Sequence, residues 1–168
     1  MEVEIRRINE KEIDLYLYLM KMVCSESNYM LMEPDEFQLG ILGIKEITTK
    51  LLSRSNSAIF LAEVNKLPVG FVLAKGSDCR RNRHCAYLVI GIRKDYQKKG
   101  IGKKLLEVVD VWAQKNGVTR LELTVVNENE SARALYKKSG YIEEGVRKKS
   151  LYISGQYKDE IYMSKTFN

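Results

Sequence analysis

The feature that most constrains this chain is a glycine-containing turn, Gln97-Lys98-Lys99-Gly100-Ile101-Gly102, at which the hydrophobic pattern changes its period. Before the turn, residues 87–92 are apolar and rich in β-branched side chains, which is typical of a central strand. After it, Ile101, Leu105 and Trp112 follow the spacing of an amphipathic helix. A turn between strand and helix brings main-chain N–H groups to the positive end of the helix dipole, so this segment predicts an anion site.

Charge around the turn favours a phosphate as that anion. The chain has a net charge of +6, and six basic residues stand between Arg93 and Lys104 against the single acidic residue Asp95. Gly100 and Gly102 lack a Cβ, so the main chain there could approach a phosphate closely. The alternative for this segment by itself is a glycine turn on a solvated basic face.

Two common phosphate loops do not fit the segment. A Walker loop fails because Gln97 occupies its first glycine position and Lys104 its hydroxyl position. A dinucleotide-binding loop fails because Leu105 stands where its third glycine is needed. The phosphate would therefore belong to another class of cofactor.

The whole chain, residues 1–168, is predicted to form a single domain, because no repeat, low-complexity tract or linker interrupts it. No segment approaches the ~20 apolar residues that span a bilayer, and the first residues do not resemble a secretory signal. The three cysteines, Cys24, Cys79 and Cys85, form no C-x-x-C pair. We therefore expect a cytoplasmic protein without a metal site or a membrane partner.

Periodicity and turn residues predict alternating helices and strands. The predicted helices cover residues 9–24, 44–52, 101–116 and 130–139. The predicted strands cover residues 3–8, 58–64, 69–75, 87–92, 121–126, 141–152 and 157–163. Residues 27–40 show no clear period, and Met30, Met32 and Phe37 there are interpreted as core rather than as the wall of a substrate pocket.

A second motif follows the turn, from Asn129 to Tyr141. Asn129 and Tyr136 are seven residues apart, which is two helical turns, so both should project from one helix face. Tyr136 taken by itself could equally be a core residue with a satisfied hydroxyl.

The two motifs together, in this order and about thirty residues apart, resemble the GNAT superfamily of N-acetyltransferases. Q-x-x-G-x-G is similar to the pyrophosphate motif of that family, and N-x-x-A-x-x-L-Y-x-x-x-G-[FY] to the motif that follows it. The resemblance implies an α/β (α+β) fold with a mixed, mostly antiparallel sheet of about seven strands and about four flanking helices. The sheet should splay between its fourth and fifth strands, here near residues 90–93 and 121–125.

The resemblance also implies acetyl-CoA as co-substrate, with its pantetheine arm in the splay and its pyrophosphate on the turn. The cofactor-binding residues expected from it are Ile90, Ile92, Arg93, Gln97, Lys98, Lys99, Gly100, Ile101, Gly102, Lys103, Asn129 and Tyr136.

An acetyl thioester is already activated, so the enzyme chiefly aligns a neutral amine, stabilises the oxyanion and protonates the departing thiolate. Tyr136 is the expected catalytic residue and supplies that proton. The main-chain amide of Ile92 is the oxyanion candidate. The reaction would be direct attack by the amine in a ternary complex.

The general base stays open. Many members of the family have a glutamate on the fifth strand five residues before the asparagine, but here that position is Thr124. Glu122, Glu33 and a water chain are left as unranked candidates. The single histidine, His84, is interpreted as a loop residue, and Cys79 and Cys85 as structural rather than nucleophilic.

The expected partner is a primary amine of a small molecule or peptide. Acidic residues flank the segments that line acceptor pockets in relatives, and they would suit a cationic amine or simply be solvated: Glu33, Asp35, Glu36, Glu143, Glu144, Asp159 and Glu160. A homodimer is an open alternative to a monomer.

Two other functions compete with this interpretation. A nucleic-acid-binding module could use the basic run, but only Tyr96 interleaves with its charges, whereas single-strand binders carry several stacking aromatics. A non-catalytic CoA-binding protein would keep the fold without the chemistry. The presence of Tyr136 favours the enzyme, and no nucleic-acid partner is expected.

Overall fold

The computed structural model describes residues 2–168. One seven-stranded sheet has the order β1-β2-β3-β4-β5-β7-β6. The strands are β1 (Glu4–Arg7), β2 (Ala58–Val64), β3 (Leu67–Gly76), β4 (Cys85–Ile92), β5 (Arg120–Val126), β6 (Ile142–Ile153) and β7 (Gln156–Thr166). Every neighbouring pair is antiparallel except β4 and β5, so the predicted mixed, mostly antiparallel sheet is confirmed.

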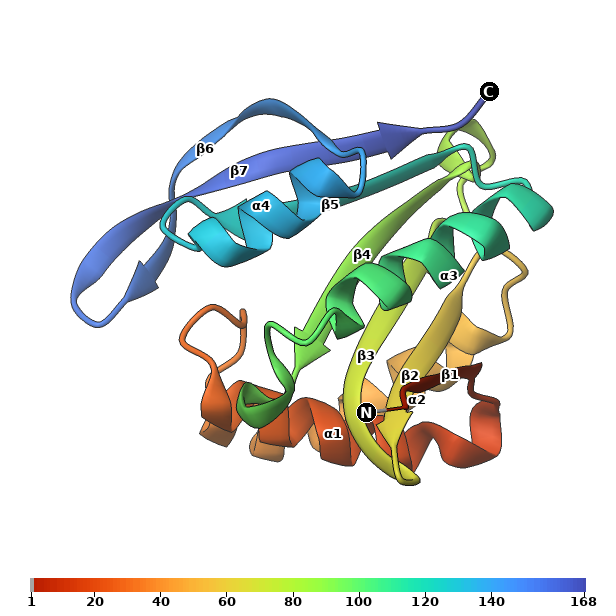
Figure 1. Ribbon diagram of the computed structural model, residues 1–168, viewed down its shortest axis with the longest axis horizontal. Coiled ribbons are helices and arrows are strands. Elements are labelled where there is room, and N and C mark those ends of the chain that lie inside the picture. Colours follow the sequence, from red (N-terminus) through yellow and green to blue (C-terminus); the bar gives the residue numbers. More distant parts are fainter. Residues whose placement is uncertain (1) are drawn as a thin grey trace.

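In the described part of the chain, four α-helices cover the two faces of the sheet (Figure 1). They are α1 (Ile13–Glu26), α2 (Pro34–Leu52), α3 (Ile101–Lys115) and α4 (Glu130–Lys138). Short 3₁₀ turns lie at Glu10–Glu12 (η1), Arg80–Asn82 (η2) and Lys94–Tyr96 (η3). No helix among residues 2–168 is long and apolar enough to cross a membrane.

Alternation along the central strands creates two cores. On β2, Phe60 and Ala62 belong to the cluster with α3, whereas Ile59 and Leu61 belong to the cluster with α1 and Phe37 of α2. A strand covered on both faces must be apolar at successive positions, which explains the uninterrupted run at the start of β2.

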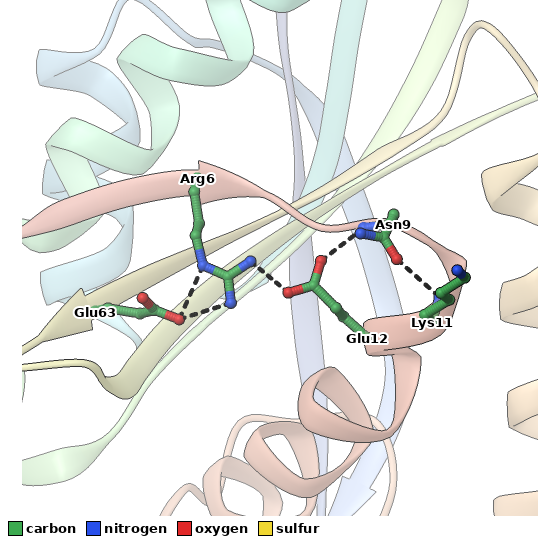
Figure 2. Close-up of polar contacts among 5 residues, drawn as sticks. All are labelled: Arg6, Asn9, Lys11, Glu12 and Glu63. Carbon is green, nitrogen blue, oxygen red and sulfur yellow. Dashed lines mark hydrogen bonds and ion pairs between the residues drawn. The ribbon is translucent and has the colours of Figure 1, made fainter.

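The N-terminal segment is fixed to the sheet by a polar cluster (Figure 2). The Arg6 guanidinium of β1 donates to Glu63 Oε1 of β2 at 2.9 and 3.1 Å and to Glu12 Oε1 at 2.6 Å. Glu12 Oε2 accepts from the Asn9 N–H at 3.1 Å, while Asn9 Oδ1 accepts from the Lys11 N–H at 2.9 Å. Asn9 and Glu12 thus form a capping box, although the turn that it opens is 3₁₀ and α1 follows.

One predicted boundary needs correction. The second helix begins at Pro34, not near Ile44, so part of the segment without a clear period is helical. Pro34 opens the helix because proline fits its first turn, and the Glu33 and Glu36 side chains form a capping box around that turn. The exposed Leu39 and Leu42 hid the helical period, since they place apolar residues on its solvent face.

The functional feature of the fold is the divergence of β4 from β5. The two strands pair only at Cys85–Arg120, Ala86–Leu121 and Tyr87–Glu122. Beyond these pairs they separate, as Figure 1 shows, so the predicted splay between the fourth and fifth strands is confirmed. On β5 the divergence begins after Glu122, slightly later than the predicted 121–125.

Candidate functional site

The splay opens a cleft of about 900 Å³. Its walls come from the end of α1 and the loop after it, from β4 and β5, from the first turn of α3, from α4, and from β6 and β7. All of the twelve residues predicted to bind the cofactor line this cleft except Arg93 and Lys99.

The turn before α3 presents main-chain donors to the cleft. Gly100 is the N-cap residue of α3 and has φ +80°, and Lys98 also has a positive φ of 58°. The first hydrogen bond into the helix runs from the Lys104 N–H to the Gly100 carbonyl at 3.2 Å. Within residues 2–168, no acceptor is found for the N–H groups of residues 100–103, so this end of the helix can hold an anion.

Side chains of the turn divide into those that face the cleft and those that do not. Gln97 lines the cleft but also supports the turn, since its Nε2 donates to the Ile92 carbonyl at 3.1 Å. Lys98 and Lys103 line the cleft as well. Lys99 instead places its ammonium 5.3 Å from the centre of the Tyr96 ring.

Arg93 is turned toward α1. Its guanidinium donates to Glu26 Oε1 at 2.9 and 3.2 Å, and the Lys94 N–H donates to Glu26 Oε2 at 2.7 Å. Burial alone would raise the pKa of Glu26, but these hydrogen bonds outweigh it and lower that pKa. Arg93 therefore anchors the entrance of the turn to α1.

Glycine is needed at the two positions of the turn for different structural reasons. Gly100 needs its positive φ, and a Cβ built there would meet nothing within 4 Å. Gly102 is buried, and a Cβ built there would lie 2.7 Å from Leu135 Cδ2 of α4 and 3.3 Å from Ile92 Cδ1. Gly102 is thus required for close packing of α3 against α4, a reason that the motif did not reveal.

Asn129 and Tyr136 both line the cleft, as their spacing predicts. Asn129 is the N-cap of α4, and its side chain accepts from the Ala132 N–H at 3.3 Å. The Tyr136 side chain is 6% exposed, and its hydroxyl makes no hydrogen bond with any residue in the described part of the chain, 2–168. Burial raises the pKa of Tyr136, and the nearby Tyr87 phenol raises it further, so the hydroxyl stays protonated.

The carboxylates considered as general base are engaged elsewhere. Glu122 accepts from Arg120 Nε at 2.9 Å, and Glu33 belongs to the cap of α2. Neither residue lines the cleft.

Four strands instead bring a different polar group into the cleft, one that the sequence did not predict. Thr124 Oγ1 donates to Glu160 Oε1 at 2.8 Å, and it lies 2.6 Å from the Tyr87 hydroxyl. The Arg147 Nη1 of β6 donates to Glu160 Oε2 at 3.2 Å. These residues line the same cleft as Tyr136. The available signal was the alternation of β7, which places Glu160 on the face that the apolar Ile161 does not share.

Histidine and cysteine provide no nucleophile or base in the cleft. His84 is exposed in the turn before β4, where its carbonyl accepts from the N–H groups of Thr119 and Arg120. Cys24 lines the cleft, but burial raises the pKa of its thiol, and burial likewise raises the pKa of Cys85 outside the cleft. Cys79 is exposed.

The segment after α1 supplies an apolar wall. Phe37 is fully buried in the core as predicted, whereas Met30 and Met32 are partly buried and line the cleft, so the core interpretation of these two was incomplete. Among residues 2–168, no group of three or more His, Cys, Asp or Glu side chains is arranged to hold a metal ion.

Comparison with known proteins agrees with this architecture. Residues 24–141 match the family model described as the acetyltransferase (GNAT) family. The crystal structure of an acetyltransferase of the GNAT family from Streptococcus pneumoniae superposes with a TM-score of 0.90 at 31% identity, covering 99% of this chain and 100% of that one.

Two curated relatives match part of the chain. An uncharacterized N-acetyltransferase of Methanocaldococcus jannaschii is 35% identical over 104 residues, which is 58% of this chain and 45% of that protein. The L-amino acid N-acetyltransferase of Escherichia coli is 33% identical over 89 residues, which is 51% of this chain and 53% of that protein. The matched regions thus span about half the length of these relatives.

Proposed function

Because this chain belongs to the GNAT acetyltransferase family, we propose that it transfers an acetyl group from acetyl-CoA to a primary amine of a small molecule or peptide. The observation that carries the proposal is the pairing of two features in one cleft. Unpaired N–H groups at the start of α3 and the Tyr136 hydroxyl both face the space between β4 and β5.

The cleft fits acetyl-CoA by its chemistry. The N–H groups of residues 100–103, with Lys98 and Lys103 beside them, would hold the pyrophosphate. Ile90 and Ile92 lie on the edge of β4 that has left β5, where their main-chain groups can bind the pantetheine amides. When bound, acetyl-CoA supplies an acetyl group already activated as a thioester.

The protein's own contribution is alignment and proton placement. Tyr136 retains its proton because burial raises its pKa, so its hydroxyl can donate a hydrogen bond to the departing sulfur. A thiol has a pKa of about 8.5, so a buried phenol is the weaker acid and stabilises the sulfur chiefly by that hydrogen bond. The Ile92 main-chain amide remains our candidate for the oxyanion donor.

The acceptor is proposed to be an amine that enters on the side of β6 and β7. The Escherichia coli relative is named for acetylation of L-amino acids, and another relative there for acetylation of the alanine of a ribosomal protein. The apolar wall at Met30 and Met32 and the carboxylate of Glu160 would suit a cationic amine with an apolar part.

A combined binding and turnover assay tests the proposal. We expect calorimetry to show binding of acetyl-CoA and CoA, and thiol release to require an amine from a panel of amino acids, polyamines, aminoglycosides and short peptides. Binding without turnover on any amine would favour a non-catalytic CoA-binding protein. Salt-dependent binding of an oligonucleotide with no binding of CoA would favour a nucleic-acid module.

A further inference from the structure

We propose that Tyr87, Thr124 and Glu160 form a proton relay that carries a proton from the acceptor ammonium to the Glu160 carboxylate. This inference rests on the proposed acetyltransferase function, and it supplies a general base in a chain that has Thr124 where many relatives have a glutamate. It is carried by the hydrogen bonds at the point where β4 and β5 separate.

The three residues occupy the vertex of the splay. Tyr87 is the last β4 residue paired with β5, and Thr124 lies two residues beyond its partner Glu122. The Thr124 N–H donates to the Tyr87 hydroxyl oxygen at 3.2 Å. The Tyr87 side chain thus takes over a main-chain donor that the separated strand β4 no longer satisfies.

The hydrogen bonds have a defined direction. Glu160 as a carboxylate can only accept, so the Thr124 hydroxyl proton points to Glu160 Oε1 at 2.8 Å. The Thr124 oxygen must then accept at its 2.6 Å contact, which makes Tyr87 the donor. The Tyr87 oxygen retains a lone pair, and Tyr87 lines the cleft, so an amine there can hand it a proton.

The carboxylate at the end of the relay is buried and has partners that hold its negative charge. Glu160 is 8% exposed, and a buried carboxylate of this kind is stable only with partners. Arg147 of β6 supplies a cation at 3.2 Å, while Thr124 of β5 supplies a hydroxyl. Tyr87 and Tyr136 line the same cleft, so the relay begins in the space that also contains the expected proton donor.

The proton balance of the relay is complete. The ammonium gives one proton to the Tyr87 oxygen, Tyr87 passes its own proton to Thr124 Oγ1, and Thr124 passes its proton to Glu160 Oε1. The ammonium becomes a neutral amine and Glu160 becomes a carboxylic acid. The amine then forms the C–N bond as the C–S bond breaks, its second proton ends on the CoA sulfur, and Glu160 later releases its proton to water.

Two substitutions interrupt the relay with little change of shape. Glu160→Gln removes the acceptor, and Thr124→Val removes the hydroxyl. We expect each to lower kcat/KM for the amine at neutral pH by about a hundredfold, which is within the range of acid–base catalysis. Thr124→Ser should restore the rate lost in Thr124→Val, and Glu122→Gln serves as a matched carboxylate control outside the cleft.

The pH profile separates a proton role from a structural role. Without the relay the enzyme must capture amine that is already neutral, so the rate of Glu160→Gln should rise about tenfold per pH unit below the pKa of the amine. The wild type should depend less steeply on pH over the same range. The assay uses whichever of L-methionine, alanyl-alanine and spermidine the wild type acetylates.

A measurement without cofactor tests the network itself. In the protein alone, NMR hydrogen exchange should show a protected Thr124 amide in the wild type and at least about tenfold faster exchange in Tyr87→Phe, because that amide loses its acceptor. Protection that is absent in the wild type, or unchanged in Tyr87→Phe, would overturn the geometry on which the relay depends.

The outcomes distinguish failure of the relay from failure of the proposed acetyltransferase function on which it rests. A wild type that acetylates an amine, together with Glu160→Gln and Thr124→Val enzymes that keep its rate and pH profile, would overturn the relay alone. A wild type that neither binds acetyl-CoA nor acetylates any of the three amines would overturn the proposed function and the relay with it. Loss of rate with restoration by Thr124→Ser and by high pH would support both.

Discussion

The turn of residues 97–103 comes from a single stretch of chain, whereas Tyr87, Thr124 and Glu160, which line the same cleft, come from three strands. The turn offers mostly main-chain N–H groups, which every residue type except proline carries. The relay offers two hydroxyls and a carboxylate, each of which one substitution can delete. We therefore expect the turn to fail when its backbone is disturbed and the relay to fail when a side chain is changed.

The largest effect should come from Gly102→Val, which disturbs the backbone at the start of α3. The added side chain would collide with Leu135, so Leu135 or the start of α3 must shift. Loss of two hydrogen bonds to charged phosphate oxygens, at about 2 kcal/mol each, corresponds to about a thousandfold weaker acetyl-CoA binding. Calorimetry measures the affinity, and the melting temperature shows whether the fold survives.

Gly145→Val is the matched control, because a Cβ at Gly145 of β6 meets nothing within 4 Å and Gly145 does not line the cleft. If Gly102→Val fails to fold, Gly102→Ala adds only the Cβ and keeps the question open to measurement. Unchanged acetyl-CoA affinity in a folded Gly102 variant would show that the start of α3 is not the phosphate site.

Next in size is Tyr136→Phe, which removes a side-chain hydroxyl from the lining of the cleft. The ring would still pack near Tyr141, whose ring centre is 5.9 Å away, so binding should change little. We expect kcat to fall by about tenfold to a thousandfold, with KM for acetyl-CoA nearly constant. Wild-type turnover across the whole pH range would show that the hydroxyl has no chemical role.

A smaller effect should follow from Gly100→Ala, which tests conformation without a collision. An alanine at φ +80° costs about 1–2 kcal/mol, but a Cβ there has open space. Acetyl-CoA affinity should fall by about tenfold or less, and the melting temperature should fall modestly. An effect on affinity larger than that of Gly102→Val would reverse the assigned roles of the two glycines.

The smallest effect should come from the exposed charges of the turn. Lys98→Gln should weaken acetyl-CoA binding about twofold to fivefold at low salt and less at high salt, because exposed charges are worth little and are screened. Lys99→Gln is the control, since Lys99 stands over Tyr96 and does not line the cleft. Equal losses in the two variants would mean that charge acts at a distance and not by contact.

Much of the fold followed from local patterns. The strands predicted at 58–64 and 69–75 form the hairpin of β2 and β3, which turns at Asn65 and Lys66, both with positive φ. The strands predicted at 141–152 and 157–163 form β6 and β7, which turn at Ser154 and Gly155. The start of α2 was missed because exposed Leu39 and Leu42 obscured its period. The spacing of apolar residues predicts a helix or strand reliably only when those residues lie on its buried face.

The sequence by itself determined the turn, since the glycines, the change of period and the basic residues all lie within one segment and their local conformation directs the N–H groups. It also determined that Asn129 and Tyr136 share a helix face. Only the tertiary structure turned Arg93 and Lys99 away from the cleft and brought Glu160 to Thr124 and Tyr87. The physical reason for the second of these is register: a slip of one residue between strands would move Tyr87, Thr124 or Glu160 to the opposite face of the sheet.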